Sequence, residues 1–363
     1  MLKLMSAAFV PLNLHSHYSL LEGLPAPAEW VQAAAARGLP ALALTDHRLL
    51  TGAVEFYTAC RKTGLRPLLG LDLELDYPDG PRRVTLLAAG EQDRVIANNH
   101  YTGKDLIHEG VPTNHASKEY QIFPSMKLIK IPQEMPDDVA ASYSIGTQTV
   151  FSMIRRLSPS PGSNILITSV RSNTSLAALN ALKRRDVNIY ALSTSHLPEE
   201  ELRIFGAKQY FRVSIGLQQG PSSFQALFDF VARERTGFDY VIDPFFDIYL
   251  ARIIDFINPG GKYITCGLWG QHSAYIHPES IPIEHDPEEM VTILQKALFK
   301  NIEIIGNCLG TTEDLANGIS SYTAGKYDVI VDSTYSGKEV DKFLQRTYVD
   351  KDRIGKVVFC YDR

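Results

Sequence analysis

The sequence predicts an α/β protein whose longer part is a doubly wound parallel sheet, preceded by a partial β/α segment. Apolar, strand-like runs alternate with amphipathic, helix-like runs along the chain, which is the pattern of parallel β/α units. Five such strands lie between residues 164 and 266. The composition also breaks near residue 93, because residues 1–93 contain no isoleucine whereas residues 94–363 contain 28. We therefore expect two segments of different origin.

The overall composition is that of an ordinary globular chain. Hydrophobic residues make up 45% and charged residues 21%, and the net charge is −5. This excludes a disordered or collagen-like chain and gives no basic footprint for nucleic acid or an anionic membrane. No run reaches the ~18 apolar residues of a membrane span. The four cysteines are widely spaced, which indicates reduced thiols, no structural zinc lobe and a cytoplasmic location.

The front segment should begin with a strand rather than a signal peptide. Its expected elements are strands at 9–14, 39–44 and 68–75 and helices at 28–37 and 52–63. Polar residues follow the strands: His15 and His17 after the first, Asp46 and His47 after the second, with Asp72 in the third. Catalytic groups of barrel folds collect at such strand ends. His15 and His17 would lie on one side of an extended chain, which suits one metal ion.

Four stretches of this segment resemble the start of the PHP (polymerase and histidinol phosphatase) domain of bacterial DNA polymerase III alpha subunits. They are residues 14–23 (LHSHYSLLEG), 41–47 (ALALTDH), 52–57 (GAVEFY) and 64–70 (GLRPLLG). The resemblance covers residues 8–90 and implies metal-ligand positions at His15, His17, Glu22, His47 and Asp72. The family usually has Asp at Glu22, Glu at Asp72 and histidine at Arg83. The barrel's later strands have no counterpart, so both a divalent-metal site and a retained, non-functional fragment stay open.

The long segment begins with three short strands, expected at residues 94–97, 118–123 and 127–132, and a helix at 137–157. Strand–helix units follow, with strands at 164–168, 187–192, 210–213, 239–243 and 262–266 and helices at 174–185, 198–205, 224–236 and 249–257. A doubly wound sheet of this kind binds its ligand at the carboxyl edge of the strands.

The turn after the first of these strands is the expected phosphate site, although it contains no glycine. It carries Ser169, Ser172 and Ser175 at three-residue intervals. Serine is small enough for close approach, its hydroxyl can bond phosphate, and a helix N-terminus offers free N–H groups. Alternatively, Asn173, Thr174 and Ser175 simply cap the helix, and both interpretations can hold together.

From residue 91 to the end, the chain resembles the medium-chain dehydrogenases/reductases, nearest the zinc-less quinone oxidoreductase branch. The supporting stretches are residues 94–97 (RVIA), 127–132 (KLIKIP), 239–244 (DYVIDP), 261–267 (GKYITCG), 306–315 (GNCLGTTEDL) and 355–358 (GKVV). The resemblance implies a Rossmann-like nucleotide-binding domain at 158–319. An incomplete GroES-like catalytic domain at 94–157 and 320–363 would follow the segment 1–93. The front of that catalytic domain is missing, and serines replace the family's glycine fingerprint.

The same resemblance assigns the parts of a cofactor site. Thr149 would lie near the nicotinamide, and Gly267 and Leu268 would border it. The pyrophosphate would be held by the turn residues Ser169, Arg171, Ser172, Asn173, Thr174 and Ser175. Ser193 and Thr194 follow the second strand where an acid would grip a ribose of NAD, and with Arg171 they favour NADP.

No acid–base constellation is evident in the sequence. His100, Tyr101, His115 and Tyr143 are the candidate proton donors, each more often a surface or core residue. His272, His277 and His285 make no ligand face, and we expect Cys266 and Cys308 to be buried. Hydride transfer needs only a positioned cofactor and a polarised acceptor.

Taken together, the sequence predicts a zinc-independent, NADP-preferring oxidoreductase that reduces an activated C=C or carbonyl of a small molecule. One alternative is a metal-dependent PHP-type phosphoesterase, and another is a composite, non-catalytic or binding protein. An edge strand near residues 281–283 could pair two copies into a homodimer.

Overall fold

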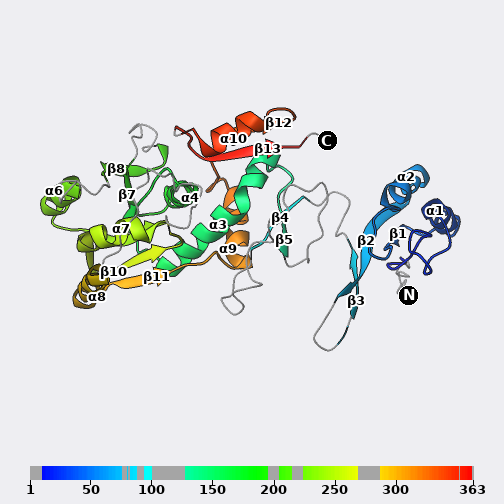
Figure 1. Cartoon of the computed structure of the whole chain (residues 1–363), viewed down its shortest axis with the longest axis horizontal. Coiled ribbons are helices and arrows are strands. Elements are labelled where there is room, and N and C mark those ends of the chain that lie inside the picture. The colour runs from blue at the N-terminus through cyan, green and yellow to red at the C-terminus, as the bar shows by residue number, and fades with distance from the viewer. Residues whose placement is uncertain are drawn as a thin grey trace, which may run out of the picture. The chain divides into compact units, whose positions relative to one another are not determined.

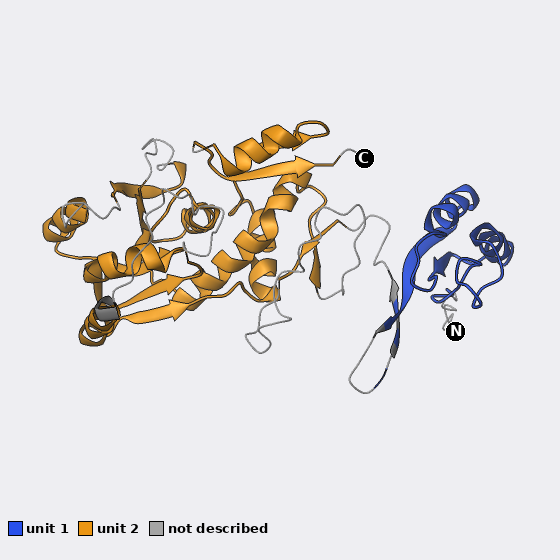
Figure 2. Ribbon diagram, viewed as in Figure 1, with its two compact units in different colours: residues 1–93 blue, residues 94–363 orange. Residues whose placement is uncertain are grey.

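The computed structural model describes residues 10–75, 80, 82–87, 94–99, 127–194, 204–214, 224–268, 287–350 and 352–361. The chain divides into two compact units, residues 1–93 and residues 94–363 (Figure 2).

The first unit is a small three-stranded sheet with two helices. Its elements are α1 (Pro27–Ala36), β1 (Ala41–Leu44), α2 (Ala53–Thr63), β2 (Arg66–Leu75) and β3 (Arg82–Leu87), and the strand order is β1-β2-β3. Val31, Leu42, Leu44, Phe56 and Cys60 form the centre of its core. This core is built from one face of each helix against β1, as the apolar spacing predicts.

Two features of the first unit differ from the sequence prediction. Strands β1 and β2 are parallel, but β3 runs antiparallel to β2. Only six residues separate Leu75 from Arg82, too few for the crossover that a parallel neighbour requires. Residues 10–14 form no strand. Their extended backbone nevertheless follows β1: the Ala43 N–H donates to the Pro11 carbonyl (3.0 Å) and the Thr45 N–H to the Leu14 carbonyl (2.8 Å).

The second unit is centred on a six-stranded parallel sheet, which confirms the predicted fold class (Figure 1). Its strands are β6 (Asn164–Ile167), β7 (Asn188–Ser193), β8 (Ala207–Arg212), β9 (Phe238–Asp243), β10 (Ile257–Thr265) and β11 (Glu303–Gly306). The order β11-β10-β9-β6-β7-β8 is that of dinucleotide-binding sheets. Strands β7 and β8 are added on one side of β6, and β9, β10 and β11 on the other, so the order reverses between β6 and β9. The sixth strand, β11, was not expected from the sequence.

Helices cover both faces of this sheet. One face packs on α3 (Asp137–Leu157), α4 (Asn173–Leu182) and α9 (Thr312–Thr323). The other packs on α6 (Gln225–Glu234), α7 (Phe246–Ile253), the short 3-10 helix η3 (Ile254–Phe256) and α8 (Pro287–Lys300). Because successive strand residues point to opposite faces, Ile165 and Ile167 join the first core and Leu166 joins the second.

Four short strands complete the described part of this unit. Strands β4 (Val95–Ala97) and β5 (Leu128–Lys130) pair antiparallel. Strands β12 (Val331–Ser336) and β13 (Lys356–Cys360) pair parallel, with α10 (Val340–Tyr348) between them in sequence. The strand expected at 118–123 and most of the helix expected at 198–205 lie outside the described residues. Within the described residues, no helix has the length and apolar character needed to cross a bilayer.

Candidate functional site

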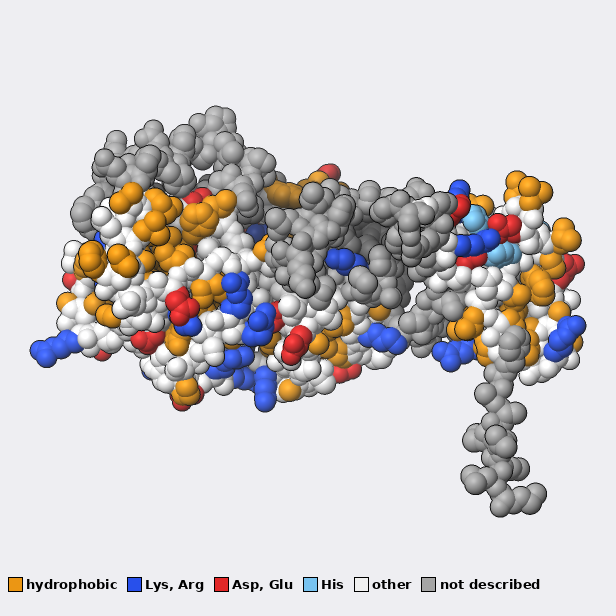
Figure 3. Space-filling model, turned by 90° about the horizontal axis from the view of Figure 1, so that it is seen from below, with side chains coloured by type: hydrophobic (Ala, Val, Ile, Leu, Met, Phe, Trp, Pro, Cys, Tyr) orange, Lys and Arg blue, Asp and Glu red, His pale blue; other side chains and the backbone are white. Residues whose placement is uncertain are grey.

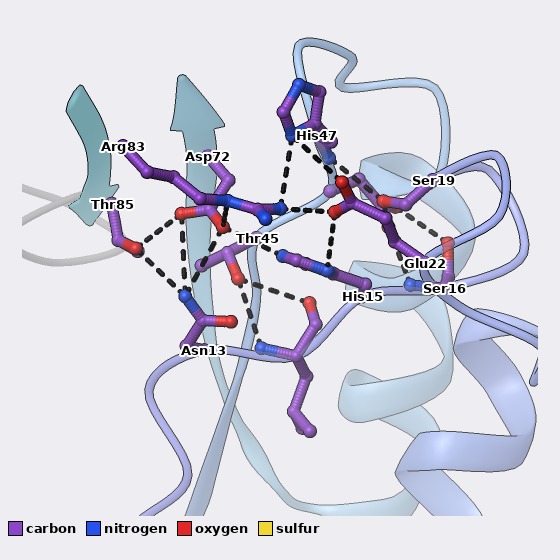
Figure 4. A network of polar contacts seen from close by, with 12 residues as sticks. Asn13, His15, Ser16, Ser19, Glu22, Thr45, His47, Asp72, Arg83 and Thr85 are labelled. Carbon is purple, nitrogen blue, oxygen red and sulfur yellow. Dashed lines mark hydrogen bonds and ion pairs between the residues drawn. The ribbon is translucent and has the colours of Figure 1, made fainter. Parts of the chain in front are cut away.

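Four of the five metal-ligand positions implied by the PHP resemblance lie together in the first unit, around the side chain of Arg83 (Figure 4). His15 Nε2 lies 2.9 Å from Asp72 Oδ2, and His15 Nδ1 lies 3.2 Å from Glu22 Oε2. His47 Nδ1 lies 3.6 Å from Glu22 Oε1. Figure 3 shows histidine, basic and acidic side chains gathered on the surface of this unit.

The backbone brings these side chains together from separate elements. Asp72 lies in β2, and its backbone bridges to His47 just after β1. Asp46, buried beside them, accepts hydrogen bonds from the Ser16 N–H (2.6 Å), the Ser16 hydroxyl (2.7 Å) and the Ser19 hydroxyl (2.7 Å). Asp46 therefore holds the loop that carries His15 against the end of β1.

The structure does not bring His17 into this cluster. The extended chain ends at residue 16 and turns, with the His17 N–H donating to the Pro25 carbonyl (2.9 Å). The His17 ring is exposed and lies 4.2 Å from the Tyr18 ring, centroid to centroid. The alternation that would place two imidazoles on one side of a strand fails because there is no strand here.

Arg83, on β3, makes the closest contacts in the cluster. Its Nε donates to Asp72 Oδ2 (3.0 Å), and its Nη2 contacts Glu22 Oε2 and lies 3.1 Å from His47 Nδ1. The hydrogen bond from Arg83 and its charge lower the pKa of Glu22, and Glu22 in turn raises the pKa of Arg83. Burial raises the pKa of Asp72, but hydrogen bonds from Thr85, His15 and Asn13, together with the Arg83 charge, outweigh it and leave that pKa lowered.

The residues present do not fit a metal ion while Arg83 is in place. Across the described residues, no group of three or more His, Cys, Asp or Glu side chains is arranged to hold one. The guanidinium carries a permanent positive charge and no lone pair. It also takes the oxygen and nitrogen atoms of Asp72, Glu22 and His47 that a metal ion would need. The phosphoesterase alternative therefore has no metal to work with in this arrangement.

The second candidate site lies in the second unit, at the carboxyl ends of the neighbouring strands β6 and β9. The helices that follow these strands, α4 and α7, cover opposite faces of the sheet. Open α/β sheets bind ligands in a crevice at such a point, and we refer to this edge of β6 and β9 as the crevice. The residues at this edge are Thr168 after β6 and Asp243 at the end of β9.

Asp243 is completely buried and organises this edge. Its Oδ1 accepts from the Thr168 hydroxyl (2.6 Å) and the Phe245 N–H (2.9 Å), and its Oδ2 accepts from the Tyr263 hydroxyl. Burial raises the pKa of Asp243 to about 6, although these hydrogen bonds act in the opposite direction. The carboxyl group thereby ties β6, β9 and β10 together beneath the crevice.

The serine-rich turn caps α4 in a way that differs from the predicted cap. Ser172 is the N-cap residue, and its hydroxyl oxygen accepts from the Ser175 N–H (3.1 Å). Ser175 is buried, and its hydroxyl donates to the Thr168 carbonyl (2.6 Å). Asn173 and Thr174 form the half-buried first turn of the helix, and Ser169 adopts a positive φ of 48°. The hydroxyls of Ser172 and Ser175 therefore shape the turn from within.

Two arginines, Arg171 and Arg212, lie near Tyr210 of β8. Arg171 Nη2 donates to the Arg353 carbonyl (3.0 Å). Burial raises the pKa of the Tyr210 hydroxyl, while the charges of Arg212 and Arg171 and a hydrogen bond with Ser193 lower it. The two arginines thus lie close to Tyr210 and Ser193, and Thr194 comes directly after β7. The next residues along the chain, 195–203, lie outside the described part.

Gly267 and Leu268 follow β10. A Cβ at Gly267 would lie 2.9 Å from the Pro244 carbonyl, so only glycine allows this close approach of the chain after β9. Burial raises the pKa of the neighbouring Cys266 thiol to about 12. Thr149 is buried on α3, with 7% of its surface exposed. Cys308, expected to be buried, is exposed because it lies in the turn between the edge strand β11 and α9.

Among the described residues, the candidate proton donors include only Tyr143, and its hydroxyl is already hydrogen-bonded in the core. The Tyr143 hydroxyl is buried and donates to the Gly318 carbonyl (2.7 Å), and burial raises its pKa far above the usual range. His100, Tyr101 and His115 lie outside the described residues, as do the loop residues His272, His277 and His285.

A buried amide network in this unit was missed in the sequence. Gln148 Nε2 donates to Asn98 Oδ1 (3.0 Å) and to the Thr311 carbonyl (2.9 Å), and its Oε1 accepts from the Asn99 N–H (3.0 Å). These contacts join α3 to the chain after β4 and to the start of α9. The adjacent amides Asn98 and Asn99, directly after a short strand, were the only signal available.

The front of the chain matches a known family. Residues 11–122 match the PHP domain, a match that extends past the end of the first unit. The DNA polymerase III alpha subunit of Escherichia coli (strain K12) is 43% identical over 84 residues, 22% of this chain and 7% of that protein. The error-prone DNA polymerase of Symbiobacterium thermophilum is 37% identical over 102 residues, 28% of this chain and 9% of that protein. The chain spans a tenth or less of the length of these relatives.

Solved structures share the fold of the longer segment. An NAD-dependent alcohol dehydrogenase superposes with a TM-score of 0.58 at 17% identity, covering 75% of this chain and 77% of that one. A thermostable alcohol dehydrogenase from Pyrobaculum aerophilum gives a TM-score of 0.56 at 20% identity, with the same coverage. Residues 11–122 are therefore similar to the PHP domain, and the unit of residues 94–363 shares the fold of these alcohol dehydrogenases.

Proposed function

We propose that residues 94–363 bind NADP(H) and reduce an activated C=C or carbonyl of a small molecule by hydride transfer, without zinc. The observation that carries the proposal is the strand order β11-β10-β9-β6-β7-β8. At the point where this order reverses, α4 begins directly after a turn that contains small residues but no glycine. Sheets of this topology bind a pyrophosphate at the N-terminus of the helix after the first strand, and this supports the proposal.

Each part of the crevice has a role in this proposal. The N–H groups at the start of α4, behind Ser172, would hold the pyrophosphate, and Ser169 and Thr174 would line its path. Gly267 and Leu268 would border the nicotinamide, with Thr149 near it on α3. The cofactor supplies the hydride when bound, so these residues need only position it and exclude water. The close approach of Gly267 to the Pro244 carbonyl supports a site built for backbone contact.

The preference for NADP rests on the residues near Tyr210. Strand β7 ends at Ser193 and Thr194 follows it, and neither of these two residues carries the carboxylate that accepts from the ribose hydroxyl of NAD in such sheets. Arg171 and Arg212 lie close to Tyr210 instead. The planar guanidinium group of arginine suits a 2′-phosphate, because two of its N–H groups can donate to two phosphate oxygens at once.

The test is a thermal-shift titration of the full chain with NADPH and NADH side by side. A ligand at ~100 times its Kd adds about 2.7 kcal/mol, which corresponds to roughly 5–10 °C for a unit of this size. We expect NADPH to raise the melting temperature and NADH to raise it much less. Arg212→Ala should weaken the NADPH shift selectively, whereas Arg252→Ala, an exposed arginine on α7, should leave it unchanged. No shift with either nucleotide would refute the proposal and favour a composite, non-catalytic chain.

A homodimer through a sheet edge is part of the same proposal. Strand β11 ends the sheet, and its Ile304 side chain is 39% exposed. The segment 281–283, expected from the sequence to pair, lies outside the described residues. Sedimentation of the full chain tests the association.

A further inference from the structure

The Arg83 guanidinium occupies the centre of the cluster in which a PHP-like sequence predicts a divalent metal ion. It contacts three of the four clustered side chains: Asp72 through Nε, and Glu22 and His47 through Nη2. The fourth, His15, lies between the same two carboxylates. Figure 4 shows these groups directed toward one another from β2, β3 and the loops beside β1.

The side chains around the guanidinium also contact one another. The separations are 2.9 Å for His15 Nε2–Asp72 Oδ2, 3.2 Å for His15 Nδ1–Glu22 Oε2 and 3.6 Å for His47 Nδ1–Glu22 Oε1. His15 thus faces the two carboxylates through different ring nitrogens, whereas a histidine binds a metal ion through one of them. Residue types that can ligate a metal are therefore gathered here, but they are arranged around a side-chain cation.

The charges of the cluster require such a cation. Asp72 and Glu22 bring two carboxylates to one point, and the Asp72 side chain is only 1% exposed. A buried carboxylate is costly unless it is paired and hydrogen-bonded. Arg83 supplies the positive charge and one hydrogen bond to Asp72, in addition to the hydrogen bonds from Thr85, His15 and Asn13. The Arg83 side chain is 47% exposed, so it reaches the cluster from the surface.

We propose that Arg83 is the resident cation of this cluster, that it excludes a divalent metal ion from the native chain, and that a histidine at this position would turn the cluster into a metal site. The first unit accordingly needs no metal for its stability. This proposal does not depend on the cofactor site of residues 94–363.

The experiment compares the full chain, without an affinity tag, with the variants Arg83→His, Arg83→Lys and Arg61→His. Arg61 is an exposed arginine on α2 and serves as the matched control for adding a histidine. Each protein is dialysed against EDTA, exposed to Zn²⁺ or Mn²⁺, freed of excess metal and analysed for metal content. Melting temperatures are recorded with EDTA and with each metal. Background binding at the exposed Cys308 is read from the native chain.

We expect Arg83→His to retain about one equivalent of Zn²⁺ more than the native chain and Arg61→His, and to melt several degrees higher with Zn²⁺ than with EDTA. The native chain and Arg83→Lys should show no metal-dependent change in melting temperature. A native chain that keeps one equivalent of metal and loses stability in EDTA would overturn the proposal, even if Arg83→His fails to fold. A folded Arg83→His that binds no more metal than Arg61→His would also overturn it.

Discussion

Replacing Asp243 by asparagine tests the electrostatics beneath the crevice. The carboxyl group is completely buried, and burial raises its pKa to about 6 from an ordinary 3.8. Asparagine has the same shape, can still accept from the Thr168 hydroxyl and the Phe245 N–H, and can donate to the Tyr263 oxygen. The substitution therefore removes the titration while keeping the hydrogen-bond geometry.

The sign and size of the effect follow from the direction of the shift. A group whose pKa is higher in the folded state stabilises the fold fully below its unfolded pKa, and this contribution is lost as the pH rises through the folded value. The window is therefore about pH 4 to pH 6. A shift of roughly two units corresponds to about 3 kcal/mol at 1.36 kcal/mol per unit, as an upper bound.

The assay is urea unfolding followed by circular dichroism, at intervals from pH 4 to pH 7.5, for the native chain and Asp243→Asn. Other titrating groups are shared, so they cancel in the difference between the two proteins. We expect the native chain to lose up to about 3 kcal/mol relative to the variant between pH 4 and pH 7. If the difference in free energy of unfolding between the two proteins stayed constant across this range, the raised pKa of Asp243 would be refuted.

Two further predictions concern the packing of α3 and α9. A Cβ at Gly318 would lie 2.3 Å from Thr147 Cγ2, so Gly318→Ala should destabilise the fold by about 1–3 kcal/mol in thermal unfolding. Gly146→Ala, on an open face of α3, should instead stabilise it by roughly 0.5–1 kcal/mol, and equal effects at the two positions would contradict this packing. Arg155→Ala removes the partner of Asp314, whose side chain is 1% exposed, and because Arg155 is half exposed the loss should be about 1–2 kcal/mol. The pairing lowers the pKa of Asp314, so this loss should shrink as the pH falls below about 4, and an effect independent of pH would contradict it.

The regular elements were largely predictable because local pattern and tertiary role agree. The helix expected at 137–157 is found at Asp137–Leu157, since its apolar face packs on the sheet and its two acidic residues begin the first turn. The strands at 164–168 and 239–243 are buried apolar runs bounded by helices, which leaves only a parallel sheet. Strand β11 is short, and three of its four residues are exposed, so its sequence carries no comparable signal.

The site geometry was less predictable because it depends on contacts between distant residues. The direction of β3 and the turn at His17 decide which side chains reach the metal-ligand cluster, and neither is encoded in the spacing of the motif. The hydroxyls of Ser172 and Ser175 were expected to face a phosphate, but in the fold they bond the turn itself. Local spacing identifies the residue types at a site, whereas the partners of each side chain follow from the assembled sheet.

Arg83 shows how a strand direction that the sequence does not reveal determines the contacts of the cluster. Its position on β3 is reached only because the chain reverses after β2, and from there its guanidinium spans Asp72 and Glu22. Two carboxylates that lie close together, such as Asp72 and Glu22, are stabilised by a positive charge between them, whether or not the site binds a metal ion. A side chain from the added antiparallel strand provides that cation in a sheet of three strands, too few to close a parallel barrel. On the proposal made above, this internal salt bridge takes the place of a metal ion and lets a partial β/α segment keep a metal-like sequence motif.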